Sequence, residues 1–383
     1  MSATRTTVRS AFGVLALSGA LLLSSCASEN NTPGGSADNA SQAGSTGNTG
    51  NTGNTDCFSG NLKAEGSSAQ KNAIDEAISV FQTKCADATI DYNPSGSGSG
   101  IKQFIAKQVD FAGSDSALKT VAVDGLVEAD DAAKACGSPA WNLPMVTGPI
   151  AVAYNVAGVD KLVLNAEVTA QIFDGRITTW NDPAIAKLNA GVKLPATPIK
   201  VYFRSDDSGT TENFTKYLKS AAPDAWSYET GKKWTGKGEG KEKSAGVATA
   251  VKGQDGGITY VELSYARQNR LQMAQIDTGS GPVVLNAESV GKTVATAKPT
   301  GSGNDLALKI DYATQESGAY PIILVTYEVV CSTYADPAQG AKVKAFLTTF
   351  ASDAVQGQLE ELGYAPLPTA VASKVQTAVK AIS

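Results

Sequence analysis

The sequence predicts an α/β protein with parallel sheets, and three observations lead to this fold class. From Cys57 onward, short runs rich in β-branched and aromatic residues alternate with segments whose apolar residues recur every three or four positions. Hydrophobic residues make up 42% of the 383 residues, which is enough for a packed core and for two domains. Strands that alternate with helices along a chain are typical of parallel sheets.

Three short strands and two helices are predicted in the first part of this body. The strands cover residues 61–65, 89–92 and 109–112. A helix is expected to begin at residues 66–68 and to place four apolar side chains on one face, namely Ile74, Ala77, Ile78 and Phe81. A second helix is expected to begin within residues 95–100 and to do the same with Ile101, Phe104, Ile105 and Val109.

The second part continues the pattern. Residues 149–154 and 200–203 are predicted strands, and the helix after the latter turns Phe214, Tyr217 and Leu218 inward. Residues 320–330 form a long β-rich run. Two closing helices are predicted at 341–362 and 369–382.

The N-terminus has the pattern of an export signal. Arg5 and Arg9 precede an apolar run of 13 residues, which is shorter than the ~20 residues that span a bilayer. Leu23-Ser24-Ser25-Cys26 resembles a bacterial lipobox, so residues 1–25 are predicted to be removed and Cys26 to be lipidated. Ordinary secretory cleavage nearby is the alternative. Residues 26–56 are rich in Ser, Asn, Gly and Thr and are predicted to be a disordered tether.

Composition excludes several function classes. The chain has no histidine, so it has no Ser-His-Asp or Cys-His nucleophile and no imidazole metal ligand. Its formal charge of -5 argues against nucleic acid as a partner. No metal and no cofactor are expected.

Four cysteines remain beyond Cys26, and an even number in an exported chain predicts two disulfides. Three pairings are possible. We favour Cys57–Cys85 and Cys136–Cys331, because Cys57 opens the first strand and Cys85 ends the following helix. A zinc site of four cysteines is disfavoured, since no CxxC pair is present.

Three Gly/Ser loops precede predicted helices, at residues 66–68, 95–100 and 208–210. In α/β sheets ligands bind beyond the carboxyl ends of the strands, and helix N-termini attract anions through unpaired N–H groups. Arg204 ends a strand directly before the third loop and can bind an oxyanion with two charge-assisted hydrogen bonds. Each loop taken alone is better explained as a helix cap with a tight turn, and only the three loops together in an exported α/β chain favour an oxyanion site.

Asp115 adds a constraint on the anion. A carboxylate in such a site accepts a hydrogen bond from an anion that still carries a proton, as phosphate does and sulfate does not. The mismatched contact with sulfate costs several kcal/mol, on the order of 10³-fold in affinity. The alternative role for Asp115 is that of a helix cap.

Six ordered segments make the chain recognisable. They are 92–103 (YNPSGSGSGIKQ), 110–115 (DFAGSD), 172–177 (IFDGRI), 180–185 (WNDPAI), 204–210 (RSDDSGT) and 257–262 (GITYVE). From about residue 60 onward the chain resembles the phosphate-binding lipoproteins of bacterial phosphate ABC transporters. The resemblance implies inorganic phosphate as ligand, a membrane permease with its cytoplasmic ATPase as partner, and a place on the outer face of the cytoplasmic membrane.

The resemblance also implies a site and a fold. Its phosphate ligands correspond to Ser68, Ala69, Ser97, Asp115, Arg204, Ser208, Gly209 and Thr210. Asp206 is expected to hold Arg204 in place, while Asp207 replaces a frequent glycine. The family fold is the two-lobed type II fold of periplasmic binding proteins, with a hinge and a ligand cleft between the lobes. Lobe I is expected at 57–148 plus 320–383 and lobe II at 149–319.

Three rival functions are weighed against this one. A secreted hydrolase or phosphatase would use Ser97 or Ser208 as nucleophile, but the chain lacks a histidine base and an evident carboxylate cluster for metals. A receptor for another oxyanion, such as sulfate or molybdate, is disfavoured by Asp115. A surface adhesin whose cleft binds nothing is the third. We therefore expect a binding protein and not an enzyme.

Overall fold

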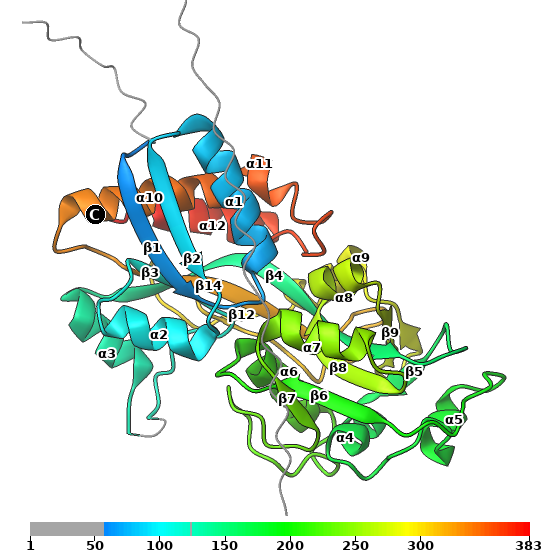
Figure 1. Cartoon of the computed structure of the whole chain (residues 1–383). Helices are drawn as coiled ribbons and strands as arrows, with labels where there is room; N and C mark the ends of the chain where they lie inside the picture. Colours follow the sequence, from blue (N-terminus) through cyan, green and yellow to red (C-terminus); the bar gives the residue numbers. More distant parts are fainter. Residues whose placement is uncertain (1–56, 123–124) are drawn as a thin grey trace, which may run out of the picture. The chain divides into compact units, whose positions relative to one another are not determined.

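The spatial order of the strands in the main sheet differs from their order in the sequence. The computed structural model describes residues 57–122 and 125–383. In spatial order the strands of the main sheet are β2 (Ala88–Asn93), β1 (Gly60–Gly66), β3 (Phe111–Ser114), β14 (Ile323–Cys331), β4 (Ala140–Asn155), β8 (Gly257–Glu262), β6 (Lys200–Arg204) and β7 (Glu239–Lys241). A further strand, β9 (Gln272–Met273), pairs with β4 (Figure 1).

This sheet is parallel at both ends and antiparallel in the middle. β1 pairs in parallel with β2 and β3, and β6 pairs in parallel with β7 and β8. β14 runs antiparallel to β3 and β4, and β4 runs antiparallel to β8. The α/β class is confirmed, and the parallel pairs that were predicted are accompanied by antiparallel pairs in the middle of the sheet. The strand–helix alternation covers only neighbours in sequence, whereas β14 comes from a distant part of the chain.

Strand β4 is much longer than the predicted strand at 149–154. Its first part pairs with β14 and its last part, from Ile150, pairs with β8. Pro144 and Pro149 obscured it in the sequence, because proline lacks the N–H that a central strand normally donates. The register shift between Thr326 and Tyr327 on β14 is the local irregularity that accompanies Pro144. One continuous strand thus belongs to both halves of the sheet.

Most of the predicted helices are present with shifted ends. Helix α1 (Lys71–Lys84) begins later than expected, because residues 67–70 form a turn in which the Ala69 N–H donates to Ser67 Oγ. Val109 lies beyond the end of α2 (Ser97–Ile105). The predicted helix at 341–362 is instead α10 (Pro337–Phe350) and α11 (Asp353–Gln356), separated at Ser352, which caps α11. The last helix is α12 (Thr369–Lys380).

The remaining elements link the strands of the main sheet or pack beside them. The helices are α3 (Glu128–Cys136), α4 (Ala166–Phe173), α5 (Pro183–Leu188), α6 (Gly209–Ala221), α7 (Lys243–Lys252), α8 (Leu263–Asn269) and α9 (Ala287–Ala295). Two small sheets consist of β5 (Val163–Asn165), β10 (Gln275–Asp277) and β11 (Pro282–Val283), and of β12 (Lys298–Pro299) with β13 (Leu308–Lys309).

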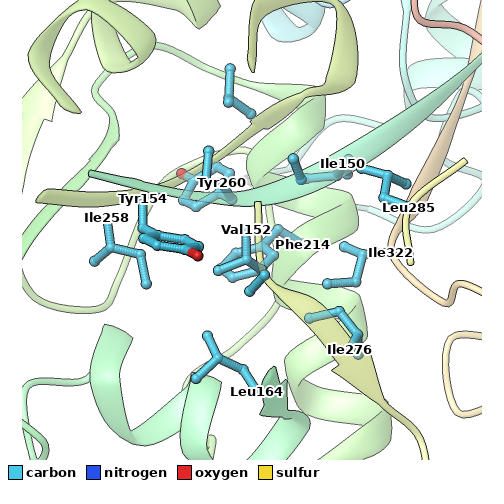
Figure 2. Close-up of a cluster of buried hydrophobic side chains, with 14 of the residues drawn as sticks. Ile150, Val152, Tyr154, Leu164, Phe214, Ile258, Tyr260, Ile276, Leu285 and Ile322 are labelled. Atoms are coloured by element: carbon cyan, nitrogen blue, oxygen red, sulfur yellow. The ribbon is translucent and has the colours of Figure 1, made fainter. Parts of the chain in front are cut away.

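The buried apolar side chains gather mainly in two large clusters. In one of them, Val152 of β4, Phe214 of α6 and Tyr260 of β8 pack together (Figure 2), and the rings of Phe214 and Tyr260 stack with centroids 4.5 Å apart. In the other, Phe111 of β3 and Phe346 of α10 stack at 5.8 Å. The lobe boundaries at 148/149 and 319/320 stay predictions.

Two disulfides join the cysteines as favoured. Cys57 pairs with Cys85, and Cys136 pairs with Cys331. Among residues 57–122 and 125–383, no helix has the length and apolar character needed to cross a bilayer, and no group of acidic residues or cysteines is arranged to hold a metal ion. The signal at 1–25, Cys26 and the tether at 26–56 lie outside the described residues.

The disulfides differ in the length of chain that they close. Cys136 and Cys331 are 195 residues apart, against 28 for Cys57 and Cys85. Chain-entropy arguments give about 5 kcal/mol of stabilisation for the long loop and about 3.5 kcal/mol for the short one. We expect replacement of the Cys136–Cys331 pair by serines to lower the free energy of unfolding more than the same change at Cys57–Cys85. Urea denaturation of the two double variants measures this, and the reverse ranking would contradict it.

Candidate anion-binding site

The register of the sheet explains where the loops meet. Tyr327 of β14 pairs on one side with Ser114, the last residue of β3, and on the other side with Pro144 of β4. The last residue of β8, Glu262, pairs with Ile150 of the same strand. Because β3 and β8 run in opposite directions, the carboxyl ends of both parallel halves converge on residues 144–150 of β4. The loops that leave these ends therefore face one another.

The eight predicted ligand residues are all buried, and hydrogen bonds or close approaches connect them near this convergence. Ser68 and Ala69 follow β1, Ser97 begins α2, Asp115 follows β3, Arg204 ends β6, Ser208 caps α6, and Gly209 and Thr210 begin α6. The first four belong to predicted lobe I and the last four to predicted lobe II. The backbone N–H of Ala69 donates within its own turn, to Ser67 Oγ at 3.0 Å.

Asp115 is held by three hydroxyl groups. Ser67 Oγ and Thr326 Oγ1 donate to its Oδ1 at 2.5 and 2.8 Å, and Ser97 Oγ donates to its Oδ2 at 3.0 Å. Burial raises the pKa of this carboxyl to about 6, although the hydroxyl bonds oppose the shift. Its backbone carbonyl accepts from Asn213 Nδ2 of α6 at 2.7 Å, which links the two sides of the site. Neither Ser67 nor Thr326 was predicted.

Arg204 is oriented by a bidentate pair with Asp206. Its Nε and Nη2 donate to the two carboxylate oxygens at 2.8 and 2.5 Å. Burial opposes the charge of Asp206, but these bonds outweigh it and hold the pKa of Asp206 below its ordinary value. The remaining nitrogen, Nη1, donates to Thr210 Oγ1 at 3.2 Å and to Ser244 Oγ at 3.0 Å.

Two buried residues at this place were missed by the sequence analysis. Ser244, near the start of α7, lies with its hydroxyl 3.0 Å from Ser68 Oγ. Glu262, at the end of β8, accepts from Thr210 Oγ1 at 2.5 Å. Each follows or ends a strand that runs parallel to β6. The carboxyl-end rule, applied to the recognised segment 257–262, would have found Glu262, whereas Ser244 follows a strand of three residues that was not predicted.

Glycines allow the loops to approach closely. A Cβ added to Gly209 would lie 2.4 Å from Ser97 Oγ and 2.5 Å from Asp115 Cβ. The backbone N–H of Gly98 donates directly to the carbonyl of Asp207 at 3.0 Å. Asp207 also pairs with Lys102 at 2.6 Å, but the exposure of Lys102 limits this pair to under about 1 kcal/mol.

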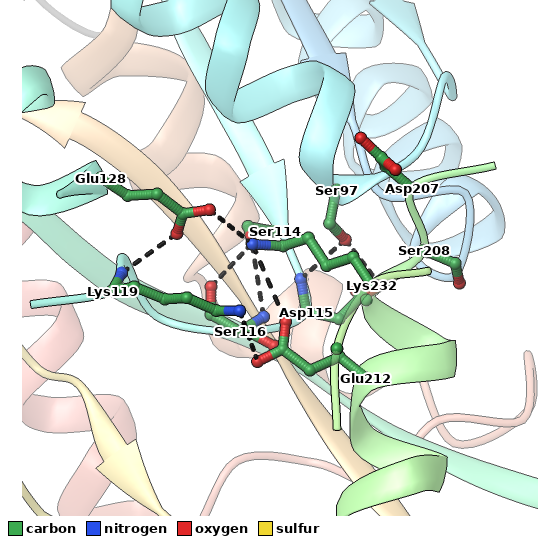
Figure 3. A network of polar contacts seen from close by, with 12 residues as sticks. Ser97, Ser114, Asp115, Ser116, Lys119, Glu128, Asp207, Ser208, Glu212 and Lys232 are labelled. Carbon is green, nitrogen blue, oxygen red and sulfur yellow. Dashed lines mark hydrogen bonds and ion pairs between the residues drawn. The ribbon is translucent and has the colours of Figure 1, made fainter. Parts of the chain in front are cut away.

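A cluster of charged side chains lies beside the site (Figure 3). Lys119 and Glu128 come from predicted lobe I, and Glu212 and Lys232 from predicted lobe II. Lys232 Nζ lies 2.7 Å from a Glu128 oxygen and 3.8 Å from one of Glu212, and Lys119 Nζ lies 3.7 Å from Glu212. Burial disfavours the charge of Glu212, but the surrounding lysines outweigh it and lower its pKa to about 2. Alternating charges thus hold the two sides together.

A second carboxyl near Asp115 is buried without such compensation. Glu328 of β14 is 0% exposed, and burial raises its pKa to about 8. A carboxyl whose pKa is higher in the folded than in the unfolded protein stabilises the fold at low pH, and this stabilisation disappears as pH rises toward 8. Asp115 also stabilises the fold at low pH, but this contribution is already lost once the pH has risen to about 6.

We therefore expect the ligand-free protein to lose stability between pH 6 and 8, and Glu328→Gln to remove most of that loss. The free energy of unfolding of the wild type should fall relative to that of the variant by about 1.4 kcal/mol per pH unit between pH 6 and 8. Thermal melting of both proteins from pH 5 to 9 measures it. Parallel curves for the two proteins would show that Glu328 does not titrate there.

Comparison with known proteins agrees with this geometry. The family described as PBP superfamily domain matches residues 39–354. Phosphate-binding protein PstS 3 of Mycobacterium tuberculosis is 45% identical over 97% of this chain and 98% of its own length. PstS 2 of the same organism is 45% identical over 84% of this chain and 87% of its own length.

Solved structures agree on the fold. The subatomic-resolution structure of a periplasmic phosphate-binding protein (PfluDING) bound with phosphate has 23% sequence identity and a TM-score of 0.66, over 83% of this chain and 93% of that one. The fold is thus the two-lobed one of the periplasmic binding proteins, as the resemblance implied. On the extent and identity of these matches, the chain belongs to the PstS family of phosphate-binding proteins.

Proposed function

We propose that this protein is an extracytoplasmic receptor that captures inorganic phosphate between its lobes and delivers it to an ABC permease for import. One observation is central to the proposal: Asp115, Arg204 and the three Gly/Ser loops meet in one buried place at the carboxyl ends of the strands. The names of the relatives support phosphate as the ligand.

The donors and acceptors of the site suit a protonated oxyanion. Serine and threonine hydroxyls, the N-terminus of α6 and Arg204 Nη1 offer hydrogens, while Asp115 offers a carboxylate. Phosphate at neutral pH has both bare oxygens and at least one P–OH, so it satisfies both kinds of partner. Sulfate lacks the proton and leaves Asp115 facing a lone pair.

The delivery step follows from the position of the ligands on both lobes. An anion that bonds Asp115 and Arg204 together stabilises the closed arrangement over an open one. A permease then distinguishes loaded from empty receptor by its shape. We propose that the permease works with a cytoplasmic ATPase, and that a lipid on Cys26 and the tether at 26–56 keep the receptor on the outer face of the membrane.

The hydrolase alternative has little support in the geometry. The Ser208 hydroxyl accepts the N–H of Thr211 as a helix cap, and the Ser97 hydroxyl is bonded to the Asp115 carboxylate. An activated serine needs a base of suitable pKa that is itself oriented by a third group. We propose binding and release without a covalent step.

Calorimetric titration of phosphate into purified protein stripped of bound anion tests the proposal. We expect one-to-one binding that excess sulfate does not displace. In Asp115→Asn the amide donates a hydrogen bond to a bare oxygen, so sulfate should gain on phosphate by about 100-fold or more. Absence of phosphate binding by folded, empty protein would refute the proposal, and displacement by sulfate would favour a receptor for another oxyanion.

The close approach at Gly209 gives a second prediction. In Gly209→Ala the new methyl group meets Asp115 Cβ and Ser97 Oγ, so the loops are forced apart. We expect phosphate affinity to fall about 10- to 100-fold while the melting temperature of the empty protein is kept. Gly246→Ala in α7 is the matched control, because its Cβ would meet neighbours at an ordinary 3.6 Å. Equal affinities for the two variants would contradict the role given to Gly209.

A further inference from the structure

Asn213 is a buried amide that lies between the two sides of the proposed site. It is 3% exposed in the first part of α6, one helical turn after Gly209. Its Nδ2 donates to the backbone carbonyl of Asp115 at 2.7 Å and to that of Gly209 at 2.8 Å. Asp115 belongs to predicted lobe I and Gly209 to predicted lobe II. One side chain therefore joins the backbones of two proposed ligand residues from different lobes.

Tyr312 fixes the orientation of this amide. Its hydroxyl donates to Asn213 Oδ1, and burial holds the pKa of Tyr312 well above its ordinary value, so the hydroxyl stays protonated. Because the amide oxygen accepts from Tyr312, the NH₂ group is turned toward the two carbonyls. Both of its hydrogens are then used, and none is left for an anion. Asn213 is thus arranged to hold the loops together and not to contact the ligand.

The bond to Asp115 differs from the other bonds of this amide in what happens when the lobes separate. Gly209, Asn213 and Tyr312 all belong to predicted lobe II, so the bonds among them are expected to persist. The Asp115 carbonyl belongs to the other lobe and moves away on opening. In the closed form it is buried with Asn213 as a donor, whereas in an open form water replaces that donor.

We propose that Asn213 is a positioning residue for lobe closure, whose bond to the Asp115 carbonyl is made only in the closed form and determines how firmly the lobes hold together around the ligand. This inference rests on the proposed function, since closure matters only to a receptor that binds its ligand between the lobes. It goes beyond that function, because Asn213 acts through the backbone of Asp115 and not on the anion. A bond made only after closure slows dissociation and leaves the encounter with phosphate unchanged.

The test measures phosphate binding to purified Asn213→Leu by calorimetry, and the dissociation rate by a chase of bound radiolabelled phosphate with unlabelled phosphate. Leucine keeps the branched shape of asparagine but offers no hydrogen, so the closed form buries the Asp115 carbonyl without this donor. We expect the affinity to fall about tenfold, through faster dissociation and with an unchanged association rate.

Asn189 is the matched control. It is 5% exposed, and its Nδ2 likewise donates to two carbonyls, those of Val163 at 2.8 Å and Ile185 at 2.9 Å. These residues all belong to predicted lobe II, so none of these bonds is made on closure. We expect Asn189→Leu to lower the melting temperature of the empty protein at least as much as Asn213→Leu does. Its phosphate dissociation rate should stay within about twofold of that of the wild type.

Two further variants act at the same place. In Asn213→Asp the carboxylate keeps the bond from Tyr312 but turns only lone pairs toward the carbonyls of Asp115 and Gly209. We expect it to lower the affinity about 100-fold or more, again through the dissociation rate. If neither change at Asn213 gives folded protein, Tyr312→Phe still tests the inference. It only releases the orientation of the amide, so dissociation should become about threefold faster.

The outcomes separate the two claims. If the wild type does not bind phosphate, the proposed function fails and the inference fails with it. If the wild type binds phosphate but Asn213→Leu and Asn189→Leu change the dissociation rate equally, or not at all, only the inference fails and Asn213 has a structural role. A loss of affinity that appears in the association rate would also overturn the inference, because the contact would then act before closure.

Discussion

The antiparallel pairing of β4 with β14 is the contact on which the rest of the molecule depends. It joins a parallel group of three strands, β2-β1-β3, to a second parallel group, β8-β6-β7, that runs the other way. Because β8 pairs with the last part of β4, the carboxyl ends of both groups point toward the middle of that strand. The loops, the helix N-termini and the charged residues of the site are all brought together by this register.

A second constraint is that charged side chains removed from water need partners of opposite charge. Arg204 and Glu212 are buried and Asp206 is half-buried, each with a partner that matches its charge, as is required for ions removed from water. Within the part of the chain that the structure describes, Asp115 and Glu328 make no ion pair, and burial together with nearby carboxylates raises their pKa values. The chain thus keeps some carboxyls firmly ionised for holding its parts together and leaves others close to protonation beside the ligand site.

Much of this arrangement could be predicted from the sequence. Local patterns sufficed for β1, β2, β3, β6 and α6, and the carboxyl-end rule located the loops of the site. The pairing of β14 with β3 and β4 could not be predicted, because it joins residues about 200 positions apart without a local signal. β4 was shortened in the prediction by its prolines. Ser244 and Glu262 were missed because their neighbours in space come from other strands, while Glu262 stood at the end of a segment already recognised.

The burial of the eight proposed ligand residues has a kinetic consequence. Ser97 and Ser208 are 0% exposed and Arg204 is 2% exposed, so an anion enclosed there has no route to solvent until the two sides separate. If the proposed site holds the anion, we expect dissociation to be limited by the rate of opening, which also breaks the Lys232–Glu128 ion pair and the Gly98–Asp207 hydrogen bond. Two anions that bind with different affinities will then dissociate at different rates only if they change the rate of opening. Residence time is therefore a property of the whole closed molecule.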